Sequence, residues 1–226
     1  MKLLALSALL LLAVRSVDDV IDSAAASLRR GDAKAEETLK RLIDSPHPVP
    51  RAQGQRIREL LRAAARASTT TVGFVGEKGT PMLVAGRVLD EDGQPVAGAV
   101  LYVFHADADG FYARDGEMNE ADARLFGFLR SGADGRFSFR TPRPGGYRKA
   151  YKGLFLPQHI HFEVTAAGKA RRAFQMTFRD DPRMNAHWQA WARAMDYPVV
   201  DVATSADGVQ QCRLDIILRK ERRSGG

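Results

Sequence analysis

Hydrophobic residues recur at helical spacing between residue 17 and about residue 67. They fall into three groups, which are Val17, Ile21 and Leu28, then Leu39, Leu42 and Ile43, then Ile57, Leu60, Leu61 and Ala64. Gly31 and the sequence SPHPVP separate these groups, because proline cannot continue a helix and drives the preceding residue toward an extended conformation. The pattern therefore predicts three short helices that form a hairpin or arm, which we place at residues 17–70.

From Thr69 onward the pattern changes to short runs rich in apolar and β-branched residues, separated by turn sequences such as Asp92-Gly93. Glycine supplies the positive φ that such tight connections require. Strands are predicted within residues 82–90, 99–107, 133–142, 159–165, 173–178 and 206–218, and one short helix is predicted within residues 180–198. Repeated strands with aspartate-glycine turns are typical of an antiparallel sandwich or small barrel. We therefore expect a mainly β domain over residues 71–222, followed by a tail at residues 223–226.

The sequence begins with MKLLALSALLLLAVRS, which contains one early lysine and an apolar run from Leu3 to Val14. This run is too short to span a bilayer, and its layout is typical of a secretory signal peptide. The alternative interpretation is an N-terminal helix docked on the domain. We expect a signal peptide at residues 1–16 and an exported protein that is secreted or periplasmic. No later segment is long and apolar enough to be transmembrane, so no stable membrane insertion is expected after cleavage.

Charge and cysteine content narrow the possible partners. Lysine and arginine exceed aspartate and glutamate by 34 to 27, which gives a formal charge of +7. The basic residues are scattered, and no helix-turn-helix, zinc-finger or RNP-type sequence accompanies them, so nucleic acid is not an expected partner. Cys212 is the only cysteine, which excludes an intrachain disulfide and a cysteine-based metal site and favours a buried structural role. These features leave the oligomeric state open.

The sequence PQHIHFEV places His159 and His161 one residue apart in a predicted strand. Successive side chains on a strand point to opposite faces, so the two imidazoles share one face while Ile160 and Phe162 share the other. Such a pair suits two ligands of one metal ion. Glu163 would complete a carboxylate site, and a third histidine would complete a zinc site. The candidates for that third histidine, His105 and His187, lie on distant segments.

Two tyrosines offer a different set of ligands. Tyr112 follows the glycine turn of DADGFY, and Tyr147 follows the glycines of RPGGY, twelve residues before His159. Both tyrosines are expected where a strand leaves a turn, at the mouth of a site and not in the core. A phenolate is a hard anionic donor, so two phenolates with two imidazoles favour ferric iron over zinc.

The order Tyr112, Tyr147, His159 and His161 resembles that of the intradiol ring-cleavage dioxygenases, which include catechol and protocatechuate 3,4-dioxygenases. The similar segments are GRVLDEDGQPVAGAVLYVFHADADGFY, SGADGRFSFRTPRPGGY and PQHIHFEV, so the resemblance covers about residues 82–180 and extends to the final strand RLDIIL. It implies a transthyretin-like antiparallel β-sandwich in which these two tyrosines and two histidines hold a non-haem ferric ion, Fe(3+). Gln175 also falls where the family keeps a glutamine near the substrate.

The resemblance further implies a reaction between a catechol-type substrate and O2 that gives a muconate-type diacid. Tyr147 matches the ligand that leaves the metal and accepts a substrate proton, and Gln175 would assist the oxygenated intermediate. One departure concerns Leu156, because the family usually has arginine three residues before the first ligand histidine. Arg143, Arg148 and Lys152 are alternative sources of positive charge near the same turn.

Two other functions are kept as alternatives. The first is a secreted transthyretin-like binding module without activity, which Leu156 favours. The second is a divalent-metal hydrolase that uses His159, His161 and either Glu163 or a third histidine.

Overall fold

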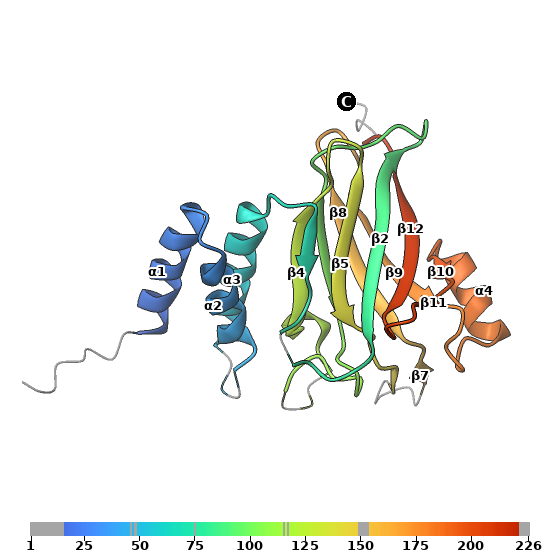
Figure 1. Ribbon diagram of the computed structural model, residues 1–226, viewed down its shortest axis with the longest axis horizontal. Coiled ribbons are helices and arrows are strands. Elements are labelled where there is room, and N and C mark those ends of the chain that lie inside the picture. Colours follow the sequence, from blue (N-terminus) through green and yellow to red (C-terminus); the bar gives the residue numbers. More distant parts are fainter. Residues whose placement is uncertain are drawn as a thin grey trace, which may run out of the picture.

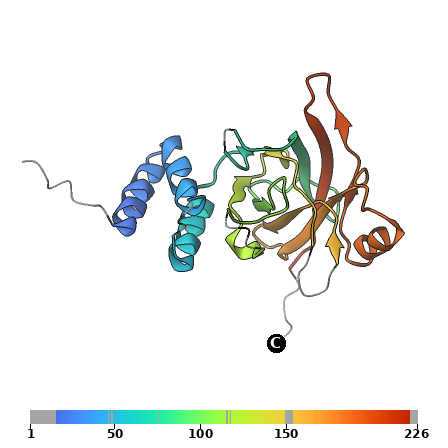
Figure 2. The same cartoon turned by 90° about the horizontal axis from the view of Figure 1, so that it is seen from below.

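The computed structural model describes residues 16–45, 47, 49–74, 76–114, 116, 118–148 and 154–221. Within these residues, three helices occur where the apolar spacing predicts them, namely α1 (Val17–Arg29), α2 (Ala33–Ile43) and α3 (Arg51–Ala64). The predicted signal peptide lies outside the described residues except for Ser16, which forms a capping box with Asp19 at the start of α1. In Figures 1 and 2 the three helices lie together at one end of the molecule, beside β4. We call these three helices the helical arm.

The rest of the described chain forms a sandwich of two five-stranded sheets. The first sheet has the order β1-β5-β2-β12-β11 and the second has the order β10-β9-β8-β3-β4 (Figure 1). The strands of the first sheet are β1 (Thr69–Thr71), β5 (Arg136–Pro142), β2 (Pro81–Asp90), β12 (Gln210–Leu218) and β11 (Ala203–Thr204). The strands of the second sheet are β10 (Val199–Val200), β9 (Arg172–Phe178), β8 (His159–Thr165), β3 (Val100–His105) and β4 (Leu125–Arg130).

Three shorter elements complete the described part of the chain. A two-stranded ribbon pairs β6 (Tyr147–Arg148) with β7 (Phe155–Leu156), and a 3-10 helix, η1, covers Glu120–Asp122. The predicted short helix is α4 (Ala186–Ala194), which lies at the opposite end of the molecule from the arm (Figure 1). In the described part of the chain, no helix has the length and apolar character needed to cross a membrane.

The sheets are mixed, so the expectation of a purely antiparallel sandwich was wrong. β12 runs parallel to β2, β1 runs parallel to β5, and β10 runs parallel to β9. The aspartate-glycine turns report only on local connections, whereas β12 reaches β2 from a distant part of the chain. Even the turn at Asp92-Gly93, where Gly93 has the expected positive φ of 75°, links β2 of one sheet to β3 of the other and forms no hairpin between them.

The main core lies between the two sheets and includes Val84, Leu101, Phe162 and Ile216. Cys212 belongs to this core with 4% of its surface exposed, as the sequence predicts. A second apolar cluster lies on the other face of the second sheet and includes residues of the arm together with Phe104, Tyr112, Tyr147 and Leu156. This second cluster surrounds the candidate site.

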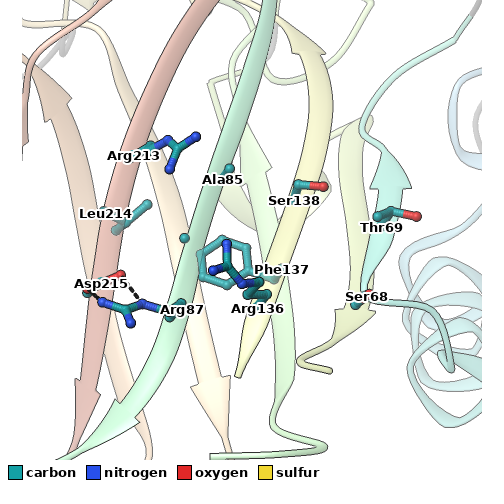
Figure 3. Close-up of a pocket in the computed structure, with 11 residues that line it drawn as sticks. Ser68, Thr69, Ala85, Arg87, Arg136, Phe137, Ser138, Arg213, Leu214 and Asp215 are labelled. Carbon is teal, nitrogen blue, oxygen red and sulfur yellow. Dashed lines mark hydrogen bonds and ion pairs between the residues drawn. The ribbon is translucent and has the colours of Figure 1, made fainter. Parts of the chain in front are cut away.

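The outer face of the first sheet carries an open hollow of about 590 Å³. Figure 3 shows it crossing β12, β2, β5 and β1, with the short side chains of Ala85, Ser138 and Thr69 and three arginines along it. Arg87 and Asp215 form an exposed ion pair across it, with an N–O distance of 2.7 Å. The sandwich separates this hollow from the histidine-bearing face of the second sheet.

Candidate metal centre

Four predicted side chains converge on the outer face of the second sheet. The Tyr112 hydroxyl lies 2.9 Å from Nε2 of His161 and 3.2 Å from the Tyr147 hydroxyl. The Tyr147 hydroxyl in turn lies 3.4 Å from Nε2 of His159. All four residues are buried, with Tyr112 fully inaccessible. Three separate segments of the chain therefore bring two phenols and two imidazoles to one point.

The histidines are placed by the alternation of β8. Ile160 and Phe162 point into the core between the sheets, which confirms the predicted apolar face, and His159 and His161 point to the other side. The Phe104 ring on β3 stacks on the His161 ring at a centroid distance of 4.5 Å and an angle of 7°. Nδ1 of His159 donates to the carbonyl oxygen of Pro157 at 2.7 Å. This bond places the imidazole proton on Nδ1, so the lone pair of His159 Nε2 faces the Tyr147 hydroxyl.

The tyrosines are placed by two loops whose backbones touch. A Cβ on Gly110 would lie 2.8 Å from the carbonyl oxygen of Gly146, and a Cβ on Gly145 would lie 2.4 Å from that of Ala108. Glycine is required at these positions because any side chain would push the loops apart. The expectation that both tyrosines stand at a mouth was wrong, because Tyr112 is fully buried and Tyr147 is only 6% exposed. Both side chains belong to an apolar cluster that also contains residues of the arm, which the turn sequences did not indicate.

The donor set fits one metal ion. Ligands held at about 2 Å from an ion, at angles between 90° and tetrahedral, lie about 2.8–3.3 Å from one another. The contacts of 2.9, 3.2 and 3.4 Å between the phenols and imidazoles are close to this spacing. Burial raises the pKa of both phenols, and the nearby Tyr147 raises the pKa of Tyr112 further. A phenolate at either position therefore requires a cation beside it, which a ferric ion would supply.

The additional ligands predicted for a divalent-metal hydrolase do not join this site. Within the described residues, no group of three or more His, Cys, Asp or Glu side chains is arranged to hold a metal ion. Glu163 pairs with Arg171 at 2.8 Å. His105 is fully buried, donates from Nδ1 to the Ala106 carbonyl and accepts at Nε2 from the Thr141 hydroxyl, while His187 is exposed on α4. The three proposed additional ligands of a hydrolase are therefore engaged elsewhere or distant.

Glu120 belongs to the site although the sequence pattern did not single it out. The Tyr147 hydroxyl donates to its Oε1 at 3.3 Å, and its Oε2 lies 4.0 Å from Nε2 of His161. Glu120 begins η1, in a loop whose sequence carries no motif, so only the folded chain reveals this contact.

The remaining predicted residues lie around this centre. Gln175 on β9 is the cross-strand partner of His161 on β8, so both side chains lie on the same face. Leu156 on β7 is paired with Tyr147 and is buried. Arg143 is directed to Asp180 at 2.7 Å and to Gln158 at 2.8 Å. The side chain of Arg148 and all of Lys152 fall outside the described residues.

Comparison with known proteins identifies the class. A family model described as "Dioxygenase" matches residues 59–220 of the chain. The chain is 31% identical over 145 residues to catechol 1,2-dioxygenase 1 of Acinetobacter lwoffii, covering 58% of this chain and 46% of that relative. It is 33% identical over 165 residues to the protocatechuate 3,4-dioxygenase beta chain of Burkholderia cepacia, covering 69% and 67%. The chain therefore spans less than half of the catechol 1,2-dioxygenase and about two thirds of the beta chain.

The solved structures agree with this class at the level of the fold. Catechol 1,2-dioxygenase from Pseudomonas arvilla C-1 superposes with a TM-score of 0.57 over 92% of this chain and 80% of that one, at 18% sequence identity. The chain belongs to a family of dioxygenases. Within that class it is a member of the intradiol ring-cleavage dioxygenases, the homologues of catechol, hydroxyquinol and protocatechuate dioxygenases. The family normally uses ferric iron and binds catechol-type substrates and O2.

Proposed function

We propose that this chain is a non-haem ferric dioxygenase that cleaves a catechol-type ring between its two hydroxyl-bearing carbons. Both atoms of O2 enter the product, which is a muconate-type diacid. The convergence of Tyr112, Tyr147, His159 and His161 within contacts of 2.9–3.4 Å carries this proposal. These four residues would hold the iron, which when bound supplies the Lewis-acid and one-electron chemistry that makes a deprotonated catechol reactive toward O2.

Tyr147 is the base in this proposal. A released phenolate with an ordinary pKa of about 10 can accept a proton from a catechol hydroxyl. Tyr147 is the more exposed of the two phenols, and Oε1 of Glu120 accepts a hydrogen bond from its hydroxyl at 3.3 Å. Once Tyr147 has accepted the substrate proton, Glu120 can therefore accept a hydrogen bond from its hydroxyl.

The other residues hold the site. Tyr112 is fully buried and has no open side from which solvent could replace it, and the His159 ring is fixed by its bond to Pro157. Gln175, on the same face as His161, is the residue we assign to the oxygenated intermediate. Leu156 adds an apolar wall beside Tyr147, which excludes water from that side.

Two measurements test this proposal: the visible spectrum of the iron-loaded protein, and then its oxygen uptake with catechol-type substrates. Protein purified with ferric iron should be reddish, because tyrosinate bound to ferric iron absorbs visible light strongly, and should hold one iron per chain. Oxygen uptake with catechol, hydroxyquinol and protocatechuate should then follow, with a diacid as product. A colourless iron-loaded protein would refute the tyrosine ligands, whereas a coloured protein without oxygen uptake would leave a metal-binding module.

A module without activity is the second candidate, and Leu156 is the observation that favours it. The residue opposite Tyr147 is apolar where the family carries an arginine. Loss of one preorganised donor typically costs about a hundredfold in rate. Measurable oxygen uptake by the wild-type protein above that of an iron-free sample would exclude this candidate.

We also propose that the protein is exported and that residues 1–16 are removed. The apolar run Leu3–Val14 supports this proposal. Cleavage after Ser16 would remove the N-cap of α1, which typically costs about 0.5–2 kcal/mol of helix stability. N-terminal sequencing of protein recovered from the periplasm or medium should begin at Val17, and an intact Met1 would contradict the proposal.

A further inference from the structure

A cluster of five charged side chains, with a buried arginine and a buried aspartate at its centre, lies between the arm and the tyrosine loops, and we call it the charge clamp. Its members are Asp44, Glu77, Asp107, Arg114 and Arg124. The Arg124 guanidinium is at its centre and contacts Glu77 at 2.7 Å, Asp107 at 3.2 Å and Asp44 at 3.3 Å. Only 7% of the Arg124 side chain and 6% of the Asp44 side chain are exposed. Buried ion pairs of this kind are strongly coupled, because removal of one member leaves an uncompensated charge.

The clamp reaches the arm through Asp44. This residue is the C-cap of α2, directly after Ile43, and its carboxylate also accepts from Nε and a terminal nitrogen of Arg114 at 2.9 and 2.7 Å. Arg114 lies two residues after Tyr112 on the same loop. Arg58 on α3 adds a second link, because it donates to the carbonyl oxygen of Ala123, next to Arg124, at 2.8 Å.

The clamp also reaches the backbone of both tyrosine loops. The Arg124 amide donates to the carbonyl oxygen of Tyr112 at 2.9 Å. The Asp107 amide donates to the carbonyl oxygen of Phe111 at 2.8 Å, and the Asp107 carbonyl accepts from the amide of Gly145 at 2.7 Å, two residues before Tyr147. Arg124 and Asp107 therefore belong to the charge clamp and also fix the backbone around the two phenols.

We propose that the charge clamp makes the helical arm a working part of the metal centre. Arg124 is a positioning residue that touches neither metal nor substrate. It links the arm to the loops of Tyr112 and Tyr147, so docking of the arm determines where the two phenol oxygens lie. Docking of the arm and binding of ferric iron then favour each other, since coupling between two sites is reciprocal. This inference rests on the proposed role of the tyrosines as iron ligands.

The test compares the wild-type protein with Arg124→Gln and Arg124→Lys, with Arg87→Gln as a matched control. Arg87 also pairs with an aspartate, but on the outer face of the first sheet (Figure 3). The measurements are amide hydrogen exchange of α1–α3 with and without ferric iron, iron affinity against a competing chelator, and the position of the visible band. We expect iron to slow exchange in the wild-type arm by about tenfold, which is within the usual range of coupling between sites.

In Arg124→Gln we expect iron affinity to fall by about tenfold or more, the visible band to shift, and arm exchange to become independent of iron. Arg124→Lys should restore part of the coupling, and Arg87→Gln should match the wild type. If Arg124→Gln does not fold, Asp44→Asn removes only the carboxylate on the arm and should still uncouple iron from arm exchange. The inference would be overturned if a folded clamp variant kept the wild-type visible band and iron affinity. It would also be overturned if bound iron did not change hydrogen exchange in the wild-type arm. A wild-type protein that is colourless with iron would instead refute the proposed ligands.

Discussion

Leu156 lies directly opposite Tyr147 in the β6–β7 ribbon. Leu156 is 8% exposed and belongs to the same apolar cluster as Tyr112 and Phe104. Arg143, the one predicted alternative source of charge whose side chain is described, is paired with Asp180 and Gln158. Among the described side chains, the surroundings of Tyr147 therefore offer an apolar wall where related enzymes are expected to carry a cation.

Replacing Leu156 with arginine, the residue expected from the family, tests directly how the apolar side chain affects the rate. Leu156→Arg should raise kcat on catechols by up to about a hundredfold, because a preorganised positive group beside the reacting ring stabilises developing negative charge. The measurement is initial-rate oxygen uptake by iron-loaded protein with matched iron content. Leu156→Met serves as the control, because it changes shape without adding charge. A folded, iron-loaded Leu156→Arg protein with the wild-type kcat would show that this position does not limit the reaction.

Removal of the Tyr112 hydroxyl should disrupt the metal centre itself. Tyr112→Phe deletes an oxygen that lies 2.9 Å from His161 and 3.2 Å from Tyr147. We expect the visible band to shift or disappear and iron affinity to fall by more than about tenfold, since even the outer partners of metal ligands are worth this much. Tyr197→Phe is the matched control, because Tyr197 packs against Trp191 at the far end of the sandwich. A spectrum unchanged by Tyr112→Phe removes Tyr112 from the site.

Local pattern was sufficient to predict the histidine pair and the arm. The two-residue period of β8 sends His159 and His161 to one face, and the apolar spacing of residues 17–64 fixes three helices. The two tyrosines were predicted as ligands from their order along the chain relative to the histidines and from the resemblance of these segments to a known family. Their burial could not be predicted, because it depends on an apolar cluster whose members come from distant segments of the chain.

Contacts between distant segments were beyond the reach of the sequence. The parallel pairing of β12 with β2 joins segments more than a hundred residues apart, and no turn sequence encodes it. Glu120 and the buried Arg124 look like ordinary surface charges in the sequence, since polar residues in a loop are mostly solvated. Their partners, Tyr147 for the first and Asp44 for the second, become neighbours only after the chain has folded.

Stability should depend on the core between the sheets. Phe162 is 1% exposed and stacks on Phe174 at a centroid distance of 5.0 Å, and the rings of Phe137 and Phe139 also pack against it. Phe162→Ala should lower the free energy of unfolding by about 3–5 kcal/mol, measured by urea denaturation, because the cavity is lined by rings that cannot collapse into it. Ile217→Ala, at a position 37% exposed on β12, should cost well under about 1 kcal/mol. Equal losses for the two variants would contradict this assignment of the core.

Acid should destabilise the fold partly through His105. This imidazole is fully buried, and burial lowers its pKa from 6.5 to about 4. In the unfolded chain His105 takes up a proton below about pH 6.5, whereas in the folded chain it does so only below about pH 4. The unfolded state therefore binds more protons in this interval, and the free energy of unfolding falls as the pH drops from about 6.5 to about 4. The contribution of His105 to this fall is about 3 kcal/mol.

The variant His105→Gln isolates that contribution. Its amide can still donate to the carbonyl oxygen of Ala106 and accept from the Thr141 hydroxyl, which are the two partners of the imidazole, but it does not titrate. The variant should be less stable than the wild type at pH 7, and the difference should shrink or reverse by pH 4, as measured by urea unfolding of the iron-free protein. His187→Gln, at an exposed position on α4, should keep the wild-type dependence on pH. If His105→Gln loses stability toward acid as steeply as the wild type, the buried His105 is not the group responsible.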